Sequence, residues 1–172
     1  MPLSKIDSDS LNSGVPTRAQ LPAGTVLQVV SGSTSTQVSS SSNVLADTGL
    51  TATITPLFAS SNILVLVNHG TIARIGAGTP SQIAMEIILL RGASQIQLLG
   101  QNLMYFIYST EGAAGAGYLE MSGPSTSVLD SPATTSPVTY KTQFRNSIGA
   151  TNGVRVQASS SQSRIVLLEI AA

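Results

Sequence analysis

The chain has 172 residues, of which 42% are hydrophobic and only 9% are charged, and its formal net charge at pH 7 is zero. That length suits one domain with a buried core, and the missing basic excess disfavours binding to nucleic acid or to anionic membranes. Because there is no cysteine, disulfides, thiolate metal sites and cysteine nucleophiles are excluded.

Residues 1–23 resemble neither a signal peptide nor a core element. Lys5, Asp7 and Arg18 interrupt the apolar run that a secretory signal needs, and no stretch of the chain reaches the ~20 apolar residues that span a bilayer. Prolines oppose a continuous helix or central strand here. We therefore expect an extended attachment arm that becomes ordered against a partner, with the aliphatic anchors Leu3, Ile6, Leu11, Val15 and Leu21.

Residues 24–172 form the second predicted unit, in which apolar and polar residues alternate as in half-buried strands. The pattern starts at 25–30, passes through the serine-rich segment 31–43 and resumes at 47–56, so we expect edge strands and turns there. The strongest strand candidates are 62–74 and 81–92, which we predict to be central.

The middle of the chain is less regular. Segment 94–99 is typical of the return strand of a hairpin, and 102–108 follows it closely. We expect a flexible loop in the glycine-rich segment 109–117, a short strand in 118–122 and a long connection in the proline-containing segment 123–137.

The last third returns to alternation. Segment 138–146 places Tyr140, Thr142 and Phe144 on one face, and 154–158 and 163–170 repeat the pattern. Roughly eight to ten strands without helices predict an all-β fold, an antiparallel β-sandwich or jelly roll preceded by the extended arm. The predicted interior includes Val65, Ile83, Ile87, Tyr140, Phe144, Val154, Val156 and Leu167.

One strand candidate is apolar on both faces. Met85, Ile87 and Leu89 share the face of Ile83, but the opposite face is apolar as well. Since the outer face of a sandwich is normally wet, we predict that this face meets another subunit through contacts that include Ala84, Glu86, Ile88 and Leu90. The alternative is a covering loop such as 123–137. Glu86 needs a partner in this apolar setting, and Arg74 or Arg91 could supply it.

Catalytic and metal-binding patterns are missing. His69 is the only histidine, and no nucleophile or carboxylate stands at a useful spacing, so we expect an ordinary hydrogen bond at a strand end. Asp7 and Asp9 fit the start of a calcium loop, but Arg18 stands where that loop requires glutamate. We predict a non-enzymatic protein without catalytic residues, cofactor or metal site.

Five segments together resemble small virion proteins and fibre-tip domains of tailed bacteriophages, particularly of cyanophages: KIDSDSLNSG, LPAGTVLQVVSG, DTGLTATITPLFASSNILVLVN, AMEIILLRGASQI and RIVLLEIA. The resemblance covers nearly the whole chain. It implies a short arm before a jelly roll similar to those of complement and tumour-necrosis-factor trimers, and hence a homotrimer, in a domain that decorates capsids or ends tail fibres.

The arm bears on the choice between these two roles. Fibre proteins of this type usually carry a long shaft between DSLNS and PAG, where this chain has only GVPTRAQL. The resemblance therefore implies a capsid decoration protein, made in the host cytoplasm, whose partners are itself and the major capsid protein or another virion protein. The alternative is a tail-fibre or fibre-tip protein that binds a host-surface glycan or receptor; the absence of tryptophan weakens sugar stacking.

Overall fold

The computed structural model describes residues 22–75, 83–106, 119–148 and 153–172, without the side chains of Ile83, 104–106 and Leu119. In these residues twelve strands form three antiparallel four-stranded sheets, which confirms the predicted all-β antiparallel sandwich. Of the predicted arm, residues 1–21 lie outside the described residues.

Each sheet has its own strand order. Sheet I consists of β1 (Val26–Thr34), β12 (Ser163–Ile170), β4 (Asn62–Asn68) and β9 (Ser125–Asp130), in that order. Sheet II consists of β3 (Ala46–Ile54), β10 (Val138–Asn146), β6 (Ile83–Arg91) and β7 (Ser94–Phe106). Sheet III consists of β2 (Val38–Ser40), β11 (Gly153–Val156), β5 (Ile72–Ile75) and β8 (Leu119–Met121). A 3-10 turn, Ala158–Ser160, precedes β12.

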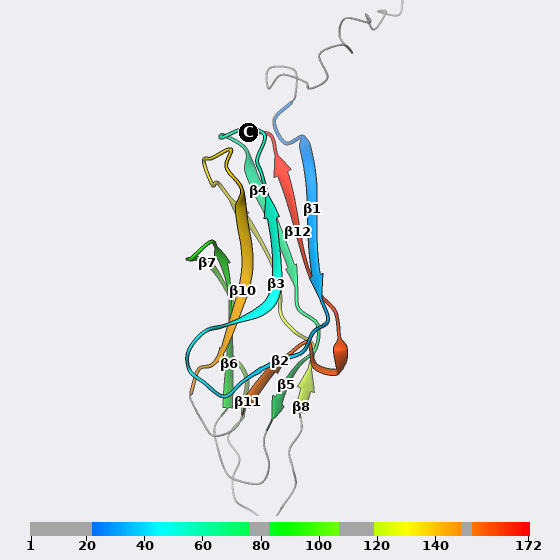
Figure 1. Cartoon of the computed structure of the whole chain (residues 1–172), viewed down its shortest axis with the longest axis vertical. Coiled ribbons are helices and arrows are strands. Elements are labelled where there is room, and N and C mark those ends of the chain that lie inside the picture. The colour runs from blue at the N-terminus through cyan, green and yellow to red at the C-terminus, as the bar shows by residue number, and fades with distance from the viewer. Residues whose placement is uncertain (1–21, 76–82, 107–118, 149–152) are drawn as a thin grey trace, which may run out of the picture.

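Sheet II runs the length of the molecule, and sheets I and III cover successive parts of its inner face (Figure 1). The first core cluster joins sheets I and II and includes Val65, Tyr140 and Leu167. The second joins sheets II and III and includes Phe144 and Val154. Seven predicted interior residues are fully buried, namely Val65, Ile87, Tyr140, Phe144, Val154, Val156 and Leu167. The side chain of the eighth, Ile83, lies outside the described residues.

Alternation along the sequence produced these faces. Along β10 the residues from Val138 to Asn146 are buried and half-buried in turn, because successive side chains of a strand point to opposite sides. Gly32 of β1 marks a close crossing, since a Cβ there would lie 2.0 Å from the backbone oxygen of Thr51. The expected edge strands β1, β2 and β3 are at sheet edges, and β4, β5 and β6 are interior strands of their sheets.

Three segments differ from the sequence expectation. The single candidate 62–74 is two strands, because the chain leaves sheet I after Asn68 and enters sheet III at Ile72. Segments 94–99 and 102–108 contribute to one strand, β7, whose pairing with β6 shifts register several times. The connection expected at 123–137 contains β9, since Pro124 and Pro132 flank this strand and do not interrupt its pairing with β4.

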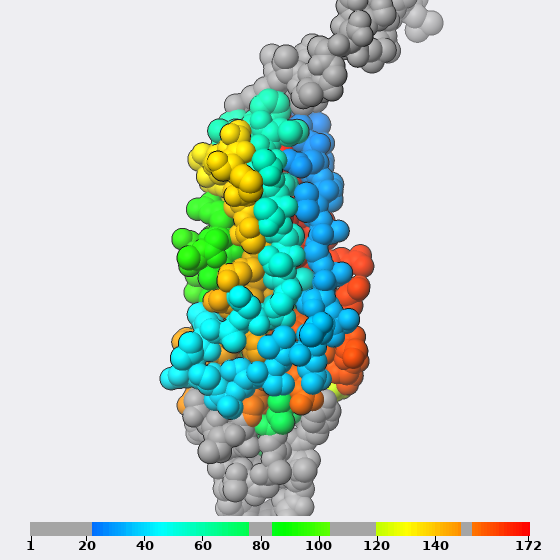
Figure 2. Space-filling model, viewed as in Figure 1, coloured from blue at the N-terminus to red at the C-terminus, as the bar shows by residue number. Residues whose placement is uncertain are grey.

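The two ends of the molecule differ. At one end the first described residues meet the C-terminus: Gly24 N–H donates to the Ala171 oxygen at 2.8 Å, and Ala171 N–H donates to the Thr25 oxygen at 2.9 Å. Sheet III lies at the opposite end (Figure 1). Figure 2 shows the chain between β1 and β3 crossing the front of this opposite end. We call these the terminal end and the distal end.

Candidate functional site

The outer face of sheet I carries a continuous row of aliphatic side chains. Directly paired residues of antiparallel strands share a face, and the register aligns one residue from each strand across the whole sheet. The next row adds two more, from β12 and β4. We call this set the apolar face: Val29, Leu168, Leu64 and Leu129 in the first row, with Val166 and Leu66 beside them.

Several of these side chains are strongly exposed. Val29 is 57% and Leu129 is 59% accessible, and both stand at the ends of the first row. The following row toward the distal end is polar and contains Arg164, which donates to Gln162. A row of exposed aliphatic residues across a four-stranded sheet is typical of a surface that meets another chain.

The predicted trimer contacts lie on the outer face of sheet II instead. Ala84, Glu86, Ile88 and Leu90 are at most 7% exposed in the single chain. Their burial therefore does not require a second subunit, and their part in a trimer stays a prediction. The partner of Glu86 is Arg145 on the paired position of β10, with an Nη2 to Oε1 distance of 3.0 Å, and neither Arg74 nor Arg91 as expected.

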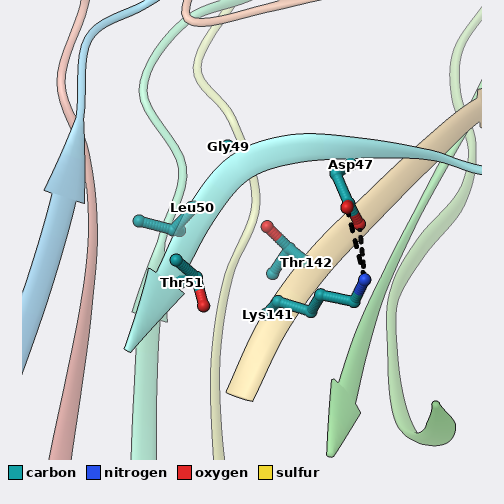
Figure 3. A pocket seen from close by; sticks show the side chains of 6 residues that line it. All are labelled: Asp47, Gly49, Leu50, Thr51, Lys141 and Thr142. Carbon is teal, nitrogen blue, oxygen red and sulfur yellow. Dashed lines mark hydrogen bonds and ion pairs between the residues drawn. The ribbon is translucent and has the colours of Figure 1, made fainter. Parts of the chain in front are cut away.

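A pocket of about 170 Å³ opens on this face where β3 bulges (Figure 3). Residues 48–50 of β3 lie opposite Thr142 alone, because Lys141 pairs with Thr51 and Gln143 pairs with Asp47. A 2.6 Å contact between the hydroxyl groups of Thr48 and Thr142 holds the bulge.

The charged groups at this pocket are paired. The Lys141 ammonium lies 2.9 Å from Asp47, and Gln143 donates to the same carboxylate at 2.8 Å. These two hydrogen bonds hold the pKa of Asp47 below its ordinary value of 3.8. Asp47 is therefore ionised at neutral pH, which makes it a poor general acid.

His69 lies in a buried polar junction between sheets I and III. Its ring Nδ1 is 3.4 Å from Ser163 Oγ, and the amide of Gln157 approaches the same hydroxyl at 2.8 Å. The ring is only 3% exposed, and its Nε2 has no hydrogen-bond partner among the described residues. Burial lowers the pKa of His69 to about 4. The predicted strand-end position is confirmed, and at neutral pH the ring is uncharged.

A charged network links the two main sheets at the terminal end. Arg91 of β6 donates from Nη1 to both carboxylate oxygens of Asp130 of β9, at 2.9 Å each. Tyr140 of β10 donates its hydroxyl to the same carboxylate at 2.7 Å. Burial and this hydrogen bond raise the pKa of Tyr140. The network ties the edge of sheet I to the centre of sheet II.

A second buried carboxylate organises the connection 55–61. Glu169 of β12 accepts from the backbone N–H groups of Leu57 and Phe58, at 2.8 and 3.2 Å, and from Gln28 at 2.6 Å. Burial alone would raise the pKa of Glu169, but hydrogen bonds from Gln28, Ser61 and these backbone groups together hold it below the ordinary value. This carboxylate is structural because its contacts are already made.

The remaining expectations concern metal sites, membrane-spanning helices, the arm and the segments 109–117 and 118–122. In the described part of the chain no three metal-ligating side chains gather, and no helix is long and apolar enough to cross a membrane. The arm anchors Leu3, Ile6, Leu11, Val15 and Leu21 lie outside the described residues, as does the expected loop 109–117. A short strand is present at 119–121, inside the expected segment 118–122.

Sequence reasoning missed the apolar face. Its signal was available, because segments 62–68 and 165–170 are apolar at successive positions in the same way as 83–90. Which of these two-sided strands stays exposed depends on what packs over it, and that is a tertiary property.

No protein-family model matches the chain, and no curated protein matches it closely enough to count as a relative.

Proposed function

We propose that the protein is a non-enzymatic structural component of a bacteriophage virion, a homotrimeric capsid decoration protein that docks through residues 1–23. The observation that carries this function is the apolar face of sheet I, which combines exposed Val29 and Leu129 with half-buried Leu64 and Leu168 across all four strands. Such a face supports assembly with other chains far better than it supports chemistry on a small substrate.

The geometry of the ends supports the same role. Gly24 and Thr25 pair with Ala171 beside the C-terminus, so the chain enters the described domain at the terminal end, and sheet III lies at the far end of the long axis. An arm that docks into a shell would therefore leave the distal end pointing away from the particle. The same arrangement would serve the alternative, a fibre-tip protein that presents its distal end to a host surface.

Trimer formation is tested by light scattering of the purified chain at micromolar concentration. The wild type should be a trimer, and Val29→Lys and Leu129→Lys should dissociate it, since a lysine in an apolar contact loses its hydration without gaining a partner. Val44→Lys, at an exposed valine in the connection between β2 and β3, is the matched control and should stay trimeric. A wild-type monomer would contradict trimer assembly.

Attachment is tested with particles that lack the protein. Full-length chain and a variant without residues 1–20 are added, and occupancy is measured by imaging. The deletion should leave a folded domain that no longer attaches, because the aliphatic anchors of the arm are gone. Equal occupancy would refute attachment through the arm, and label on tails instead of heads would favour the fibre-tip alternative.

A further inference from the structure

A second pocket lies near the Arg91–Asp130 network and shares no lining residue with the apolar face. Its volume is about 270 Å³, and it opens where the hairpin turn at Gly92 meets the connection between β9 and β10. Arg91 contributes the charged side chain, Thr134 a hydroxyl group, and Pro132 and Pro137 the rigid apolar walls. The described residues that line it include no carboxylate.

Arg91 is held in place with part of its guanidinium unused. Arg91 Nη1 donates to both carboxylate oxygens of Asp130, and the Tyr140 hydroxyl donates to the same carboxylate. Within the described chain, Nε and Nη2 have no hydrogen-bond partner, while the side chain is 35% exposed. The Nε–Nη2 edge of a guanidinium matches the two oxygens of a carboxylate. Because the Asp130 contact already fixes the side chain, little rotamer entropy remains to be lost on binding.

Thr134 supplies a further donor to the pocket. Thr134 Oγ1 accepts the backbone N–H of Ser136 at 3.0 Å, which leaves its own hydroxyl proton free for a ligand. The Gly92 N–H is already used by the Thr139 oxygen at 2.8 Å, so the turn is fixed. The Arg91–Asp130 pair has no net charge. Recognition must therefore come from hydrogen-bond geometry, which favours a singly charged carboxylate over a dianion such as phosphate.

We propose that this pocket binds the carboxylate group of a small acidic ligand, with Arg91 Nε and Nη2 as a bidentate donor and Thr134 as a second donor. The structural role of Arg91 in joining β6 to β9 uses Nη1 alone and leaves the Nε–Nη2 edge of this half-buried pocket residue without a partner in the described chain. Two sources carry this chemistry, an acidic sugar and a peptide carboxylate. Binding here does not depend on virion membership, on the arm or on the apolar face.

The test is a ¹H–¹⁵N NMR titration of the full-length chain with two matched pairs of probes. Galacturonate is compared with neutral galactose, and N-acetylglycine with N-acetylglycinamide. The backbone signals of Gly92, Thr134 and Thr139 should shift with the acids and stay unchanged with their neutral partners. Shifts with galacturonate alone identify an acidic sugar as the source, and shifts with both acids identify the carboxylate itself.

Three variants locate the site. Thr134→Val loses the hydroxyl at a half-exposed position and should weaken binding roughly tenfold, as expected for one lost charge-assisted hydrogen bond. Arg91→Lys keeps a cation for Asp130 but loses both hydrogen bonds of the bidentate contact, so it should weaken binding more than Thr134→Val does. Arg164→Lys, on the outer side of sheet I, should leave binding unchanged. If Arg91→Lys does not fold, Thr134→Val carries the test. Equal shifts with acid and neutral probes, no shifts, or unchanged binding in Thr134→Val would overturn the assignment.

Discussion

The folded protein should lose stability as the pH falls below 6.5, because the unfolded chain then binds a proton at His69. In this pH range the carboxylates are still ionised. The buried ring has a pKa of about 4, against an ordinary value of 6.5. Between these values the unfolded chain binds a proton that the folded chain does not. Stability is therefore complete above pH 6.5 and falls as the pH is lowered from 6.5 toward 4.

The size of the effect follows from the same two values. One pKa unit corresponds to about 1.4 kcal/mol of unfolding free energy, so the difference between the two pKa values corresponds to about 3 kcal/mol. Of this free energy, about 2 kcal/mol should be lost between pH 7.5 and pH 5. Glu169 and Asp47 also have lowered pKa values, but their ordinary values of 4.5 and 3.8 place their contribution below this range. His69 is the only histidine, so the interval from pH 5 to 7 reports on it alone.

The assay is urea unfolding at pH 7.5, 6 and 5, at one fixed protein concentration because assembly also affects apparent stability. A direct reading of the pKa comes from the ring proton signals of the single histidine. His69→Gln should have a flat profile between pH 5 and 7. Equal unfolding free energies of the wild type at pH 7.5 and pH 5 would refute the burial of an uncharged ring. So would a His69→Gln variant whose unfolding free energy still falls between these pH values.

Three further substitutions test the packing, each by urea unfolding. Phe144→Ala should destabilise the fold by about 3–5 kcal/mol because Phe144 is fully buried between sheets II and III; a loss below about 1 kcal/mol would contradict that placement. Gly32→Ala should cost about 1–3 kcal/mol because its Cβ would collide with the Thr51 oxygen, whereas Ser33→Ala next to it should be nearly neutral. Glu169→Gln should cost about 1–3 kcal/mol and speed amide exchange at Leu57 and Phe58; unchanged exchange there would show that the carboxylate does not hold the connection.

The sequence by itself determined the strand faces of this protein. Tyr140, Thr142 and Phe144 alternate with charged or amide residues, and a strand has only two sides, so their common burial could be predicted without knowing what covers them. The same reasoning placed Val154 and Val156 inside and identified His69 as a residue at a strand end. Regular alternation without helical periodicity was enough for the all-β class.

Only the tertiary structure decided which partners these faces meet. Segments 62–68 and 83–90 are both apolar on two sides, yet Ile88 is buried in the single chain and Leu66 is exposed. The partner of Glu86 is distant in sequence, and strand register places Arg145 opposite it. The Arg91 pocket likewise depends on the tertiary structure, since the connection after β9 meets the turn after β6 there. Periodicity is a local property of the chain, whereas pairing and covering arise from contacts between segments far apart along it.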